Sequence, residues 1–135
     1  MSHGEAVLYV QHLGPMTEFY ERVFELQRAE HAQDFCELRS ADWTLWLVSG
    51  TGTAAIDQTG VARRRSEVPI KLCFAVASIA AARAAMGGRG GRSSDRVWEF
   101  GGYLRTDIVD PEGNVVQLLA PVEPGPADLS DGPRR

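Results

Sequence analysis

Side chains that could bind a ligand or a metal ion recur at alternate positions in four short strand-like runs. Because side chains alternate across a strand, each set points to one side of its sheet. A carboxylate and an amide can ligate a divalent ion, an ammonium and a thiol offer polar contacts, and aromatic rings offer stacking surface. The set comprises Glu5, Val7, Tyr9, Trp46, Lys71, Cys73 and Gln117.

Two further candidates, Arg105 and Asp107, share one face of a later strand-like run. Two interpretations stay open for them, pairing with each other or binding a polar ligand. Cys73 could act as a nucleophile, but no histidine lies near it in the sequence, so a small packed thiol is the simpler interpretation. The histidines, His3, His12 and His31, have no metal-ligand spacing and are expected at the surface.

The elements that would position these residues form a pattern that occurs twice. Residues 5–24 form an alternating strand and then a helix that starts at Pro15, and residues 71–88 repeat the strand and a helix capped by Ser78. About three short strand-like runs follow each helix. The pattern predicts an α+β domain of two βαβββ modules, whose curved mixed sheets surround a cleft.

The expected modules span about residues 5–48 and 70–121, with a linker at 49–69. In the first helix, Met16, Phe19, Tyr20 and Val23 have the spacing of one buried face. Residues 122–135 are rich in proline and glycine and are predicted to form a disordered tail. The predicted strands after the first helix are 26–31, 35–39 and 43–48; those of the second module are 70–76, 93–98, 103–109 and 114–119, with a helix at 79–86.

Composition limits the possible classes of function. The chain has 135 residues, a net charge of -4 and 44% hydrophobic residues, which indicates one soluble globular domain without nucleic-acid partners. Arg63, Arg64 and Arg65 form the only basic run and are expected in a solvated loop. No apolar run is long enough to cross a membrane, and no export signal is visible, so we expect a cytoplasmic protein with two reduced thiols.

The order of elements, with Phe19-Tyr20 in the first helix and the turn Asp110-Pro111-Glu112-Gly113-Asn114 before the last strand, resembles the vicinal oxygen chelate superfamily. That group includes glyoxalase I, extradiol dioxygenases and the fosfomycin- and bleomycin-resistance proteins. Independently of the resemblance, Pro111 and Gly113 suit a tight turn, and the Asp110 carboxylate can accept hydrogen bonds from nearby backbone N–H groups.

The resemblance implies that four strand positions would carry metal ligands, and matching the landmarks places Glu5, Trp46, Lys71 and Gln117 there. Only Glu5 and Gln117 can offer oxygen, and an ammonium would repel a cation, so no metal and no other cofactor is expected. One hypothesis is that Lys71 replaces the metal and is held by Glu5 and Gln117. The alternative is a lysine at a strand end that reaches into solvent.

The resulting prediction is a metal-independent protein that binds a small organic molecule, like the drug-sequestering resistance proteins of the superfamily. No catalytic residue is assigned. Tyr9 and Trp46 would flank the ligand, although aromatic residues near the cleft, Trp98 among them, could instead fill the core or form a dimer interface, and a homodimer is expected. The alternatives are a metal-dependent lyase, isomerase or dioxygenase of the same superfamily, and a regulatory protein with a vestigial cleft.

Overall fold

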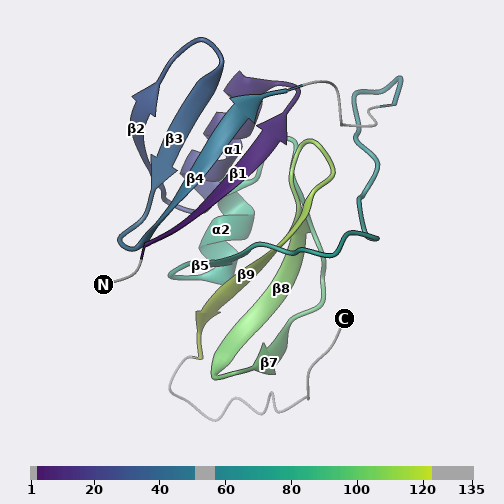
Figure 1. Cartoon of the computed structure of the whole chain (residues 1–135). Coiled ribbons are helices and arrows are strands. Elements are labelled where there is room, and N and C mark those ends of the chain that lie inside the picture. The colour runs from purple at the N-terminus through teal and green to yellow at the C-terminus, as the bar shows by residue number, and fades with distance from the viewer. Residues whose placement is uncertain (1–2, 51–56, 123–135) are drawn as a thin grey trace.

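The computed structural model describes residues 3–50 and 57–122, which form two modules of the predicted kind (Figure 1). Module one contains β1 (Gly4–Val10), α1 (Leu13–Val23), β2 (Gln27–His31), β3 (Phe35–Arg39) and β4 (Trp43–Ser49). Module two contains β5 (Cys73–Ala75), α2 (Ile79–Ala85), β6 (Arg92–Ser93), β7 (Trp98–Phe100), β8 (Tyr103–Val109) and β9 (Val115–Pro121). The α+β class and the two βαβββ modules are therefore confirmed.

Each module has its own mixed sheet. The strand order is β1-β4-β3-β2 in module one and β5-β9-β8-β6 in module two, where β7 also pairs with β8. The first strand of each module runs parallel to the last, and the other pairs are antiparallel. The helix of each module packs on one face of its sheet, so that the opposite face of each sheet is directed away from the core (Figure 1). We call these two faces the outer faces.

The first helix buries the predicted face but begins earlier than predicted. Met16, Phe19, Tyr20 and Val23 are almost fully buried. The helix starts at Leu13, so Pro15 is its third residue rather than its first. The first N–H groups of a helix have no partner within the helix, so a proline is tolerated throughout the first turn.

An aromatic cluster in the core joins the two modules. The ring of Phe74 on β5 lies 4.2 Å from that of Phe24, 5.1 Å from Trp43 and 5.8 Å from Tyr20, centroid to centroid. Phe24 and Tyr20 come from the end and middle of α1, and Trp43 begins β4. Burial of these rings against one another stabilises the contact between modules.

Two strand predictions for module two are wrong in their extent. The expected strand 70–76 is limited to Cys73–Ala75, because only these residues pair in register with β9. The expected strand 93–98 is divided into β6 and β7, because Ser94 and Arg96 turn their carbonyl oxygens toward the side chains of Arg83 and Thr106. The predicted cap of α2 is confirmed: the Ser78 hydroxyl accepts a hydrogen bond of 3.1 Å from the Ala81 N–H.

Part of the predicted linker is held against module two. Ala62 is buried, and the Arg65 N–H donates to the Gly113 carbonyl over 2.8 Å. Gly113 has a φ of 90°, and a Cβ there would lie 2.0 Å from the Arg63 oxygen, so the close approach requires glycine. Linker residues 51–56 and tail residues 123–135 lie outside the described part of the chain. Neither described helix is long and apolar enough to cross a bilayer.

Candidate functional site

On the outer face of the module-two sheet, four of the predicted site residues form a continuous chain of hydrogen bonds. The Lys71 ammonium donates to both carboxylate oxygens of Asp107, at 3.2 and 3.3 Å. The Gln117 amide then donates to Asp107 over 3.1 Å and accepts from the Arg105 guanidinium over 2.9 Å. Arg105 and Asp107, whose relation the sequence left open, are therefore linked through Gln117.

The Arg105 guanidinium is fixed from several sides. Its Nε donates to the Phe100 carbonyl over 3.0 Å, and its charge lies 5.5 Å from the Phe100 ring and 5.9 Å from the Tyr103 ring. These contacts hold the polar chain in one arrangement on the sheet, since a planar guanidinium stacks on aromatic rings while it donates hydrogen bonds.

Cys73 lies beside this polar chain but is not activated by it. Its Sγ is 4.0 Å from the Gln117 carbonyl oxygen. Partial burial raises the pKa of the Cys73 thiol, against the opposing effect of the Arg105 and Lys71 charges. The thiolate is the nucleophilic form, so the raised pKa does not favour Cys73 as a nucleophile.

This environment leads to a prediction about thiol reactivity. At pH 8 we expect Cys73 to react with a disulfide reagent more slowly than free cysteine, because its raised pKa leaves less of it as thiolate. Cys36 is 2% exposed and burial raises its pKa, so it should react only after unfolding. Stopped-flow labelling of the protein and of Cys73→Ser checks this. A fast phase that survives in Cys73→Ser would contradict the assignment of that phase to Cys73.

The outer face of module one carries the other predicted residues. Val7 and Tyr9 are 54% and 60% exposed, as the alternation of β1 predicts. The Glu5 carboxylate accepts a hydrogen bond of 3.3 Å from the Trp46 indole N–H. The predicted set is thus divided between the two sheets, with Glu5 and Trp46 in contact on module one and the chain from Lys71 to Arg105 on module two.

The four positions where the fold family would hold a metal do not fit one. The hypothesis that Glu5 holds Lys71 is wrong, because the Lys71 ammonium pairs with Asp107. Trp46 offers only an N–H donor, and the Gln117 oxygen already accepts from Arg105. Across residues 3–50 and 57–122, no three His, Cys, Asp or Glu side chains are grouped so as to hold an ion.

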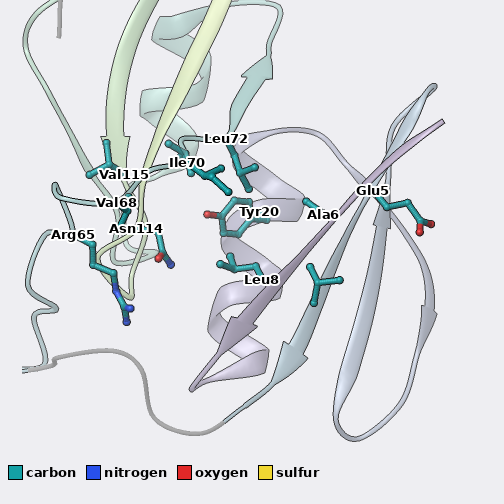
Figure 2. A pocket seen from close by; sticks show the side chains of 12 residues that line it. Glu5, Ala6, Leu8, Tyr20, Arg65, Val68, Ile70, Leu72, Asn114 and Val115 are labelled. Carbon is teal, nitrogen blue, oxygen red and sulfur yellow. The ribbon is translucent and has the colours of Figure 1, made fainter. Parts of the chain in front are cut away.

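Between the two modules, where the sequence predicts a cleft, runs an apolar groove whose lining the sequence did not predict. Its volume is about 560 Å³, and its walls are β1 on one side and residues 65–72 with the start of β9 on the other. Figure 2 shows Ala6 and Leu8 facing Val68, Ile70 and Leu72 across the groove, with Tyr20 between them. Arg65 and Asn114 supply polar groups on the module-two side (Figure 2), and Glu5 and Val7 are the only predicted site residues in the lining.

The turn before β9 adjoins this groove through Asn114 and joins the modules. The Glu112 carboxylate, 2% exposed, accepts from the Gln11 and His12 backbone N–H groups at 2.8 to 3.0 Å. The Asp110 carboxylate accepts from the Glu112 and Asn114 N–H groups, as the turn motif predicts, and also from the Tyr20 hydroxyl over 2.7 Å. Sequence reasoning assigned the turn correctly but missed that it reaches module one.

Burial governs the ionisation of Tyr20 and Asp110. Desolvation, with the nearby Asp110 and Glu112 charges, raises the pKa of the Tyr20 hydroxyl well above its ordinary value. Desolvation also raises the pKa of Asp110, although its hydrogen bonds with Tyr20 and Asn114 oppose this. Tyr20 therefore stays a neutral donor and serves as a structural wall of the groove, not as a base.

The arrangement of the two modules can be compared with solved structures. A glyoxalase/bleomycin resistance protein/dioxygenase family enzyme from Burkholderia phytofirmans PsJN superposes with a TM-score of 0.65 at 16% identity, over 87% of this chain and 97% of that one. A glyoxalase/bleomycin resistance protein from Albidiferax ferrireducens T118 gives 0.62 at 20% identity, over 90% and 98%. The fosfomycin resistance protein FosX from Listeria monocytogenes gives 0.59 at 13% identity, over 90% and 93%.

These matches define the fold of the protein. No family model and no curated protein sequence matches the chain. The structural neighbours share its element order over nearly their whole length, so the chain has the vicinal oxygen chelate fold. At these identities the likeness concerns the fold and not the reaction.

Proposed function

We propose that this protein binds a small organic molecule, without a metal ion, in the groove between its modules. The observation that carries the proposal is the groove itself, about 560 Å³ in volume and lined mainly by apolar side chains with a few polar groups. Pockets for small molecules usually have about 300–1,000 Å³ and this kind of lining.

The character of the groove favours an amphipathic ligand. Val68 and Ile70 are 50% and 72% exposed in the free chain, so a bound molecule would remove apolar surface from water. Arg65 and Asn114 offer N–H donors to a carbonyl or acidic group of the same molecule. Some proteins with this fold carry names that refer to resistance to bleomycin or fosfomycin, and sequestration of a drug-like compound is the form of binding we propose.

Metal independence is supported by the chemistry of the matched positions. A catalytic centre generally needs about three protein ligands, and here an ammonium paired with Asp107 occupies one of four positions and an indole another. A metal-dependent lyase, isomerase or dioxygenase is therefore the less favoured function. Formation of a homodimer and a cytoplasmic location stay predictions.

The test uses two valines of similar exposure. A thermal-shift screen of aromatic acids and amides, with protein dialysed against a chelator, should yield a ligand. Val68→Ser should weaken its affinity about tenfold, because a hydroxyl replaces apolar contact surface. Val61→Ser, at a valine that is 44% exposed and outside the groove lining, should leave the affinity unchanged. Calorimetric titration measures both.

Two outcomes would contradict the proposal. One is equal weakening by Val61→Ser and Val68→Ser, which would mean that the ligand lies elsewhere. The other is purified protein with one equivalent of iron, zinc, nickel or manganese, whose removal by the chelator abolishes binding. That result would support the enzyme instead.

A further inference from the structure

A second cavity, lined by none of the groove residues, lies at the edge of the module-two sheet where the linker crosses β6. Its volume is about 370 Å³. Three of its lining side chains are arginines, and one of them, Arg64, belongs to the basic run that the sequence places in a solvated loop. The lining residues are Arg64, Arg92, Ser93, Ser94, Arg96, Trp98, Asp107 and Val109.

The charge of this cavity is strongly positive in a chain whose net charge is -4. Within the described ranges, Arg64, Arg92 and Arg96 form no ion pair. The single carboxylate in the lining, Asp107, is already paired with Lys71. Three guanidinium groups beside one neutralised carboxylate attract an anion.

Two further carboxylates lie near the lining residues: Asp95, which stands between Ser94 and Arg96 in the chain but does not line the cavity, and Asp57. Hydrogen bonds from Thr59 and Val61 lower the pKa of Asp57, and the Arg92 charge contributes last. The hydrogen bonds from Thr59 and Val61 all go to Oδ1 of Asp57, and Asp57 does not line the cavity. It therefore reduces the positive potential near Arg92 and leaves Arg64 and Arg96 available.

Side-chain hydrogen bonds to neighbouring backbone and hydroxyl groups hold the walls of this cavity in place. The Arg92 guanidinium donates to the Ala62 carbonyl over 3.0 Å, which holds the linker against β6. The Arg83 guanidinium donates to the Ser93 hydroxyl over 2.9 Å and to the Ser94 carbonyl over 2.6 Å, and the Thr106 hydroxyl donates to the Arg96 carbonyl over 2.7 Å. A cavity whose backbone is fixed in this way loses little conformational entropy when it binds a ligand.

The aromatic and hydroxyl groups complete a polar site. Trp98 is 5% exposed but stands outside the core cluster, and the Arg96 guanidinium lies 5.8 Å from its ring. The Ser94 hydroxyl accepts a hydrogen bond of 3.1 Å from the Arg96 N–H, so its own proton can be donated to a ligand.

We propose that this cavity binds a small oxyanion, namely free phosphate or the phosphoryl group of a small molecule. Guanidinium groups match the geometry of phosphate oxygens with paired N–H donors, and charge-assisted hydrogen bonds are the stronger kind. Arg64 and Arg96 supply the charge, Ser94 supplies a hydroxyl donor, and Trp98 forms the apolar side of the cavity. This cavity shares no lining residue with the intermodule groove. The proposal of anion binding therefore does not depend on the function proposed for the groove.

The test titrates the full chain with inorganic phosphate at constant ionic strength, followed by calorimetry and by NMR of the arginine Nε–H groups. We expect saturable binding with shifts at Arg64, Arg92 and Arg96. Arg64→Ala should weaken it about tenfold, since it removes a charge-assisted contact, and Arg64→Lys should restore part of the affinity. The Arg64 side chain forms no hydrogen bond with another described residue, so Arg64→Ala should fold.

Arg63→Ala is the matched control, because it removes the same charge from the same basic run outside the cavity lining. It should change the phosphate affinity less than twofold. Equal weakening by Arg63→Ala and Arg64→Ala, or a linear response without saturation, would overturn the proposal in favour of general counter-ion attraction. Tighter binding of phenyl phosphate than of phosphate would identify a phosphoryl compound as the ligand, and equal binding would identify free phosphate. Val68→Ser should leave phosphate binding unchanged, which separates this test from that of the groove.

Discussion

Replacing Phe74 by alanine should lower the free energy of unfolding by about 4 kcal/mol. This value lies within the range measured when large buried side chains are replaced by alanine. Phe74 is 3% exposed and its ring contacts rings from α1 and β4 of the other module. The substitution would leave a cavity at the contact between modules that Phe24 and Trp43 cannot fill without moving the sheets. Chemical denaturation followed by tryptophan fluorescence measures the loss, because Trp43 lies in the cluster.

Phe100→Ala is the matched control for this prediction. Phe100 is 46% exposed and contacts mainly the Arg105 guanidinium. Its replacement should cost less than about 1 kcal/mol. Similar losses from the two variants would mean that Phe74 does not hold the modules together.

Replacing Glu112 by alanine should cost about 3 kcal/mol and lower the Tm by about 10 °C. The carboxylate accepts three hydrogen bonds from two backbone N–H groups just before α1, about 100 residues away in the chain. Without it, those N–H groups would lose their charged acceptor, and the N-terminal end of the α1 dipole would lose a negative charge.

Glu112→Gln separates the contribution of the hydrogen bonds from that of the negative charge. It keeps one acceptor oxygen but no charge, so we expect about half of the loss. Glu67→Ala, at an exposed glutamate, should leave stability within about 0.5 kcal/mol. If Glu112→Ala were no more destabilising than Glu67→Ala, the turn would not join the modules.

The sequence predicted the features that depend on local spacing. The alternation in β1 correctly assigned Val7 and Tyr9 to the exposed face, and the helical spacing of Met16, Phe19 and Tyr20 correctly assigned them to the core. The residue types Asp110, Pro111 and Gly113 correctly predicted a tight turn. These predictions succeeded because backbone geometry alone sets which side of an element a side chain occupies.

Where local spacing was ambiguous, the element bounds were wrong. Residues 93–98 were predicted as one strand, but only Val97 and Trp98 are strong β-formers, and hydrogen bonds from Arg83 and Thr106 divide the segment in two. The Arg63–Arg65 run lies in a loop as predicted, with Arg63 and Arg64 exposed, but the sequence did not show that Arg64 lines a cavity and Arg65 the groove. Only the packing of the linker on module two brings them there.

What the sequence by itself determined is the element order, the faces of the strands and the chemistry available on them. What only the tertiary structure decided is which of those groups meet. The sequence suggested Glu5 and Gln117 as partners for Lys71, and in the folded chain its ammonium donates to Asp107 instead. The groove, likewise, is lined by residues from β1, the linker and β9, which no local spacing relates. The physical reason is that the direction of a side chain is a property of its own few residues. The partner it finds depends on how two separately folded sheets pack against each other.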